Sequence, residues 1–273
     1  MRFLKLVFDF YLNASIHVAF SVCAFIRITE IYFDLHFNEN INYFMFFGTI
    51  TGYNFVKYAG VAKLHHRSLT KDLRIIQIFS FFAFIALCYY TYQISLQTLY
   101  FTFPFFLLTI LYAVPFLSGF DKNLRQISYL KIIVVAIVWA GFTVLIPLLD
   151  VNKDITLDFV FLILQRFLIV IILILPFDIR DVKYDSISLQ TIPKKIGVQR
   201  TKKLGLTLLV FTLVLEYLIS SSTIVKTPFM IFFFLVILFL MRAKIKQSKY
   251  YSSFWVESLP IVWWLILLGF HNN

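Results

Sequence analysis

The chain has 273 residues, of which 60% are hydrophobic and only 14% are charged, and its mean hydropathy is +0.85. Soluble domains are roughly a quarter charged, so this composition excludes an ordinary soluble protein and indicates a polytopic membrane protein. The net charge of +11 does not indicate a nucleic-acid partner, because basic residues of membrane proteins gather in their cytoplasmic loops.

Apolar stretches long enough to cross a bilayer recur along the whole chain. In chain order we predict spans at Leu12–Ile28, Ile41–Tyr58, Ile75–Tyr92, Leu96–Leu117, Tyr129–Leu149, Ile155–Phe177, Leu204–Ser222, Thr227–Met241 and Phe254–Phe270. The first contains the polar residues Asn13, His17 and Ser21 and could lie partly in the membrane interface. We therefore expect an all-α polytopic bundle of about nine transmembrane helices, forming a single domain over residues 1–273.

The basic residues alternate between the two sides of these spans. Most of the 25 Lys and Arg fall in Met1–Leu6, Gly60–Arg74, Ser118–Lys131, Asp178–Lys203 and Arg242–Tyr250. The segments on the other side hold only Arg27, Lys153 and Lys226. Positive charge marks cytoplasmic loops, so the pattern predicts a cytoplasmic N-terminus and a C-terminus outside. We expect an integral protein of a bacterial inner membrane.

A cluster of carboxylates ends the sixth predicted span. Asp178, Asp181 and Asp185 stand three and seven positions apart in a chain with only 14 acidic residues, and this spacing places them on one helix face. Like charges on one face repel, and a divalent cation removes that cost. Carboxylate oxygens suit Mg²⁺, which binds substrate phosphates. The cluster predicts a metal and phosphate site; the alternative is a solvated helix end.

Two ionisable residues lie deep inside predicted spans. Arg166 and Glu216 belong to neighbouring spans, and charged groups at such depth usually face the bundle interior in pairs. We predict an ion pair between them that locks the two helices together. A role at a substrate is the minority interpretation.

The stretch Asp178-Ile-Arg-Asp-Val-Lys-Tyr-Asp185, followed by Thr191-Ile-Pro-Lys-Lys-Ile-Gly197, resembles the second aspartate-rich motif of the UbiA superfamily of intramembrane prenyltransferases. Tyr129-Leu130-Lys131 at the start of the fifth span is similar to the family's basic start there. Nine helices with both motif loops in the cytoplasm are also the family's arrangement.

The first family motif is degenerate here. Asn54 matches its asparagine, but Phe55, Tyr58 and Ala62 then stand where the family has aspartates. Arg67-Ser68 and Lys71-Asp72 fall, without a gap, where the family has Arg-Thr and Arg-Pro. The resemblance therefore implies a scaffold that keeps its basic residues and loses half of its metal ligands.

What the resemblance implies is transfer of a prenyl group from a polyprenyl diphosphate to a lipid or aromatic acceptor, with membrane lipids around it. Asp178, Asp181 and Asp185 would be the catalytic and Mg²⁺-binding residues. The diphosphate would be held by Asn54, Lys57, Arg67, Lys71, Arg180 and Lys183. Lys57 could supply positive charge where the family has metal-bound aspartate.

Each of these residues also has a structural interpretation. Lys57 could simply extend its ammonium group to the interface, and Asn54 could join two helices. Arg180 and Lys183 could pair with the aspartates instead of a phosphate. At the level of function, the alternatives are a catalytically silent UbiA-like scaffold or lipid-binding partner and, last, a transporter.

Overall fold

The computed structural model describes residues 2–64, 71–114, 124, 127, 129–183, 191–219 and 223–271, without the side chains of residues 2, 59–64, 71, 72 and 223. These residues form helices and no strands. The α-helices are α1 (Arg2–Asn13), α2 (Ile16–Tyr32), α3 (Glu39–Leu64), α4 (Lys71–Gln93), α5 (Leu96–Ala113), α6 (Leu130–Ala140), α7 (Ile146–Asp150), α8 (Leu157–Asp181), α9 (Ile192–Ile196), α10 (Val198–Leu218), α11 (Thr223–Arg242) and α12 (Leu259–His271). Two π-helical turns, η2 (Gly141–Leu145) and η3 (Tyr251–Val256), precede α7 and α12. The predicted all-α class is confirmed.

The helices are suited to a bilayer. Within the described residues, 6 helices are long and apolar enough to cross a membrane, or 7 if the bent pair α1–α2 counts as one span. The more polar helices α3 and α10 have 26 and 21 residues, which is long enough to cross at 1.5 Å per residue. The chain is therefore an integral membrane protein, and the number nine stays a prediction.

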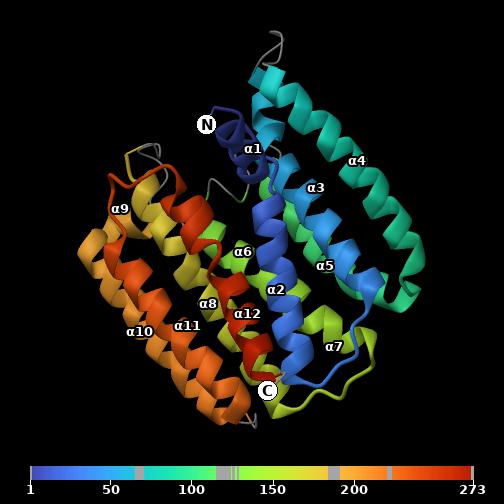
Figure 1. Ribbon diagram of the computed structural model, residues 1–273, viewed down its shortest axis with the longest axis vertical. Helices are drawn as coiled ribbons and strands as arrows, with labels where there is room; N and C mark the ends of the chain where they lie inside the picture. Colours follow the sequence, from blue (N-terminus) through green and yellow to red (C-terminus); the bar gives the residue numbers. More distant parts are fainter. Residues whose placement is uncertain are drawn as a thin grey trace.

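The bundle has two sides that meet at its centre (Figure 1). Helices α3, α4 and α5 lie on one side, and α9, α10 and α11 lie on the other. Between them α2 packs against both α3 and α12, while α8 packs against α6 and α10. The N-terminus and the C-terminus lie at opposite ends of the bundle.

Local sequence sets several helix ends. Ser95 and Thr156 precede α5 and α8, and their hydroxyls accept hydrogen bonds from the amides of Thr98 and Phe159. These contacts satisfy amides that the first helical turn leaves unpaired. Helix α8 does not stop at Phe177, where the predicted span ends. It continues to Asp181, so Asp178 and Asp181 are helical residues.

The first predicted span, Leu12–Ile28, is wrong at its start. Ser15 has a φ of 62°, a left-handed conformation that interrupts the helix, and α1 and α2 meet at an angle of 55°. Helix α1 exposes Phe3, Leu4 and Val7 and also carries charged residues, a mixture typical of a helix lying in the membrane interface.

Arg166 and Glu216 are both buried, but the predicted ion pair between them is wrong. The Arg166 guanidinium donates to the carbonyl oxygen of Phe25 at 2.9 Å and stacks on the Phe25 ring at 4.0 Å. The Glu216 carboxylate instead accepts hydrogen bonds from Gln165 at 2.8 Å and from the Tyr32 hydroxyl at 2.9 Å. Consecutive helical residues point about 100° apart, so Gln165 faces α10 while Arg166 faces α2.

A close helix contact in this core gives a stability prediction. A β-carbon at Gly205 on α10 would lie 2.6 Å from Leu240 and 2.9 Å from Leu175, two buried side chains of α11 and α8. We expect Gly205→Ala to lower the free energy of unfolding by about 1–2 kcal/mol through overpacking.

The matched control is Gly269→Ala on α12, where an added β-carbon meets nothing within 4 Å. We expect this change to be neutral or slightly stabilising, as alanine favours helix. Thermal unfolding in detergent measures both variants. Equal midpoints for Gly205→Ala and the native chain would contradict the packing described here.

Candidate functional site

The acidic end of α8 contains an ion pair whose carboxylate is buried. Asp178 is fully buried, and its Oδ1 lies 2.9 Å from the Nζ of Lys131 in the first turn of α6. A buried carboxylate is costly unless a cation and hydrogen bonds compensate its charge. Lys131 supplies that charge and fixes the end of α8 against the start of α6. The sequence resemblance had marked Lys131 only as part of a basic helix start.

Asp181, one helical turn further on, has a different environment. It is about 30% exposed and forms a bidentate ion pair with its neighbour Arg180, with distances of 2.7 Å and 3.0 Å. The Arg180 guanidinium also lies 5.3 Å from the centre of the Phe177 ring. The predicted salt bridge of Arg180 is therefore present, and its phosphate contact stays a prediction. Lys183, two residues beyond Asp181, is exposed.

Asn54 on α3 closes the break between α1 and α2. Its amide nitrogen donates to the carbonyl oxygen of Ala14 at 3.1 Å and to the Ser80 hydroxyl at 2.8 Å, and its oxygen accepts from Ser15. The Tyr58 hydroxyl similarly donates to the carbonyl oxygen of Asn13. Carbonyls at a helix end need such partners when they are removed from water. These contacts give buried Asn54 a structural role.

Lys57 is exposed, and its Nζ donates to the Ser15 hydroxyl at 2.8 Å. No carboxylate of the described residues forms a salt bridge with it, so its charge is available at the same break in the helices. The hydroxyl contact keeps the ammonium group on the inner side of α3, beside α2. This position is compatible with the predicted phosphate contact.

Glu257 lies at the junction of η3 and α12. Lys57 on α3 and Arg180 on α8 are the two basic groups that act electrostatically on its carboxylate. The Glu257 carboxylate makes no hydrogen bond or salt bridge with any described residue. Its main chain is anchored, since the carbonyl accepts from Ser21 and the amide donates to Ser252 at 3.2 Å. Glu257 is not among the residues singled out from the sequence, although a carboxylate next to an apolar span is a signal of function.

The side chains of three predicted site residues lie outside the described part of the chain. Arg67 and Asp185 are not described, and of Lys71 only the main chain is described, as the first residue of α4. Their roles stay predictions. The structure brings Lys57 and Arg180 into electrostatic range of a common carboxylate, and it directs Asn54 into the helix break.

The described residues do not by themselves make a Mg²⁺ site. Asp178 is engaged by Lys131 and Asp181 by Arg180, so a metal would have to displace both cations. Within the described ranges, no group of three or more His, Cys, Asp or Glu side chains is arranged to hold a metal. Among the described residues, Lys131 and Arg180 supply positive charge at this end of α8.

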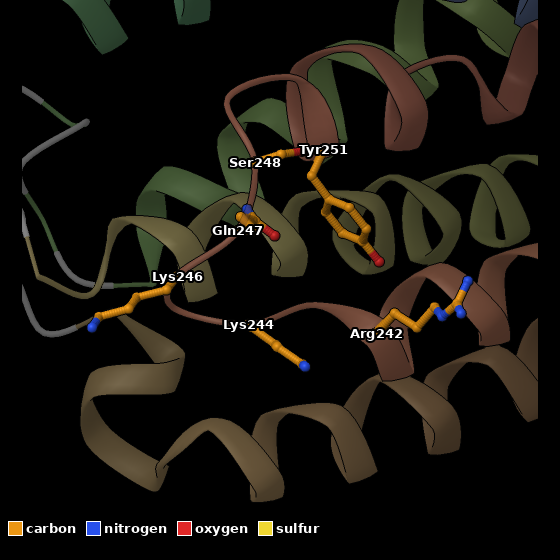
Figure 2. A pocket seen from close by; sticks show the side chains of 6 residues that line it. All are labelled: Arg242, Lys244, Lys246, Gln247, Ser248 and Tyr251. Atoms are coloured by element: carbon orange, nitrogen blue, oxygen red, sulfur yellow. The ribbon is translucent and has the colours of Figure 1, made fainter.

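A separate pocket lies where α11 ends and η3 begins (Figure 2). It has a volume of about 270 Å³ and is lined by Arg242, Lys244, Lys246, Gln247, Ser248 and Tyr251, which we call the basic pocket. Gln247 joins the pocket to α8 by donating to the carbonyl oxygen of Pro176 at 3.2 Å. Next to the pocket, a hydrogen bond to the Asp9 carboxylate raises the pKa of Tyr250.

Together these features define an all-helical integral membrane protein with a charged site at the end of one helix. Three solved structures have the same architecture over the full chain. A digeranylgeranylglyceryl phosphate synthase structure matches with a TM-score of 0.57 and 17% identity, covering 99% of this chain and 98% of its own. A UbiA homologue from Archaeoglobus fulgidus matches in two forms. With GPP and Mg²⁺ bound the TM-score is 0.54 at 12% identity, covering 100% of both chains. With DMAPP and Mg²⁺ bound the TM-score is 0.55 at 11% identity, covering 100% of this chain and 99% of the other.

No family model and no curated protein matches the sequence. The structural matches nevertheless establish the architecture, and the chain has the fold of the UbiA superfamily, as the aspartate motif predicted.

The ion pair between Lys131 and Asp178 generates a prediction. Lys131→Met leaves a buried carboxylate without its cation, and we expect a loss of about 3 kcal/mol in the free energy of unfolding. Adding Asp178→Asn removes the uncompensated charge, so the double variant should be more stable than Lys131→Met alone. Chemical unfolding in mixed micelles gives the double-mutant cycle.

Lys203→Gln is the control, because Lys203 is exposed on α10 and should leave stability unchanged. If the effects of Lys131→Met and Asp178→Asn are simply additive, the two side chains do not stabilise each other and the description of this helix end is wrong.

Proposed function

We propose that the chain transfers a prenyl group from a polyprenyl diphosphate to an acceptor at the cytoplasmic side of the membrane. The observation that carries the proposal is the UbiA fold over the whole chain, with Asp178 and Asp181 at the end of α8. Structures with this fold bind GPP or DMAPP together with Mg²⁺. The same class of substrate suits a helix end where acidic and basic side chains alternate.

The reaction requires the charge of the diphosphate to be neutralised. The allylic C–O bond breaks with its electron pair leaving on the diphosphate, and the acceptor forms a bond to the allylic carbon. Cations placed near the departing oxygens stabilise that charge more in the transition state than in the substrate. Lys57 on α3 and Arg180 on α8 would supply this positive charge. Lys183, Arg67 and Lys71 are further predicted contacts of the diphosphate.

The predicted cofactor is Mg²⁺, which Asp178, Asp181 and Asp185 would hold once it displaced Lys131 and Arg180 from the two described aspartates. Oxygen donors fit its chemistry, and a bound Mg²⁺ supplies positive charge to a diphosphate. Lys131 and Arg180 already engage the described carboxylates. Basic side chains would therefore neutralise more of the diphosphate charge here than in a site with two aspartate motifs.

The second candidate is a catalytically silent scaffold or lipid-binding partner with the same fold. It is favoured by Phe55 and Tyr58, which stand where the family resemblance places aspartates, and by the ion pairs that already occupy Asp178 and Asp181. A scaffold would retain these pairs for stability alone.

We also propose a bacterial inner membrane, with the N-terminus in the cytoplasm and the C-terminus outside. The alternation of basic segments supports this orientation. The placement of the two termini at opposite ends of the bundle agrees with it (Figure 1).

Binding of geranyl diphosphate, measured by titration calorimetry with and without Mg²⁺, tests the proposed function. We expect Mg²⁺ to tighten binding by roughly tenfold, and Asp181→Asn to remove that dependence because a neutral amide is a poor ligand for the metal. Asp154→Asn is the matched control, since Asp154 is exposed in the loop before α8.

Asp154→Asn should behave as the native chain does. Equal affinity with and without metal, unaffected by Asp181→Asn, would support the silent scaffold. Absence of any binding by the native chain would contradict both the prenyltransferase and a diphosphate-binding scaffold.

A further inference from the structure

The basic pocket is lined by other residues than those at the aspartate end of α8, and it has a charge of its own. Of the four basic residues in Arg242–Tyr250, only Lys249 is neutralised, by an ion pair of 2.7 Å with Asp9. Arg242, Lys244 and Lys246 line the pocket, and no salt bridge of the described residues reaches them.

A fourth cation adds to this unbalanced charge. Lys202 on α10 is largely buried, and its Nζ donates to the carbonyl oxygen of Met241 at 2.6 Å. It lies within electrostatic range of Lys244. An orientation signal for the membrane needs only positive charge in a loop. Cations that are left without carboxylates around a hollow are instead suited to bind an anion.

The arrangement of polar groups indicates a phosphate. Figure 2 shows Arg242 and Lys244 on one side of the pocket and Gln247, Ser248 and Tyr251 on the other, while the Lys246 side chain extends to the left, away from the other two cations. The Tyr251 hydroxyl is already engaged, because it donates to the carbonyl oxygen of Phe239 at 2.6 Å. The guanidinium, the ammonium groups and the Ser248 hydroxyl are left as donors, and all of them suit phosphate oxygens.

The position of the pocket favours a lipid as the source of that phosphate. Arg242 is the last residue of the apolar span Ile224–Arg242, which places it at the depth of the headgroups. Phe234, Leu238 and Met241 are exposed on α11 at 62%, 45% and 44%. Their spacing of four and three positions puts them on one helix face that leads to the pocket. An acyl chain can lie along this face while its phosphate reaches the cations.

We propose that the basic pocket binds the phosphate of an anionic phospholipid from the surrounding leaflet. The lipid contacts the loop that Gln247 fastens to α8, so it stabilises the bundle next to the acidic helix end. This site is separate from the proposed diphosphate site, and it holds whether the chain is an enzyme or a scaffold.

The test uses the full chain in nanodiscs made from an equimolar mixture of phosphatidylglycerol and phosphatidylcholine, followed by native mass spectrometry of the retained lipids. We expect the native chain to retain phosphatidylglycerol over phosphatidylcholine by about tenfold, given the attraction of several basic residues at a membrane surface. The combined variant Arg242→Gln, Lys244→Gln and Lys246→Gln should lose this preference.

The matched control replaces three exposed cations at the same end of the bundle, Lys5→Gln, Arg200→Gln and Lys203→Gln, and removes the same charge. It should retain phosphatidylglycerol as the native chain does. Equal loss in the control, or undiminished preference in the pocket variant, would overturn the proposal. Lys244→Gln alone should weaken the preference, which provides a measurement if the triple variant does not fold.

A final competition experiment distinguishes a bound lipid from a bound soluble anion. Inorganic phosphate in excess should leave the retained phosphatidylglycerol in place, because the acyl chains contribute to binding. Displacement of the lipid by inorganic phosphate would show that the pocket takes a soluble anion and would overturn the assignment to a lipid.

Discussion

The ion pair between Lys131 and Asp178 constrains the part of the bundle on which the proposed chemistry depends. It joins the first turn of α6 to the last turns of α8, and its carboxylate is fully buried while Lys131 is only partly buried. A charge removed from water is tolerated only with a partner, so these two helix ends cannot separate without a large loss of free energy. The positions of Arg180 and Asp181, three residues or fewer further along α8, follow from this fixed point.

Helix α3, which carries Lys57, is fixed by a different set of contacts. The left-handed Ser15 breaks the first helix, and the carbonyl groups exposed by the break are satisfied by Asn54 and Tyr58 from α3. Lys57 lies between these two residues in the sequence and donates to Ser15 itself. A chain without the first aspartate motif thus retains a cation at a structurally fixed position. The Lys57 ammonium group is close enough to act electrostatically on the Glu257 carboxylate, as is the Arg180 guanidinium from α8.

Much of the architecture could be predicted from the sequence because it depends on local patterns. Apolar runs predicted helices, and the spacing of Asp178 and Asp181 predicted that they share the end of one helix. The motif also predicted the UbiA fold, although overall identity to the matching structures is only 11–17%. These features need no knowledge of which helices are neighbours.

The errors concern long-range partners and local backbone irregularities. Arg166 and Glu216 were both correctly expected to be buried. Consecutive residues of a helix point about 100° apart, so Gln165 contacts Glu216 on α10 while Arg166 contacts Phe25 on α2. The depth of a residue in its span does not show which neighbouring helix its side chain faces. Nothing in the pattern of Leu12–Ile28 indicated that Ser15 would adopt a positive φ. Lys131 could be matched to a family feature, but its pairing with Asp178 follows from the packing of α6 on α8.

A structure of the full chain with geranyl diphosphate is the most direct test of the central claim, that the end of α8 and the facing Lys57 form a diphosphate site. The account predicts that the diphosphate lies beside Asp181, in contact with Lys57 and Arg180. A diphosphate bound in the basic pocket, or anywhere that these two side chains do not reach, would contradict it.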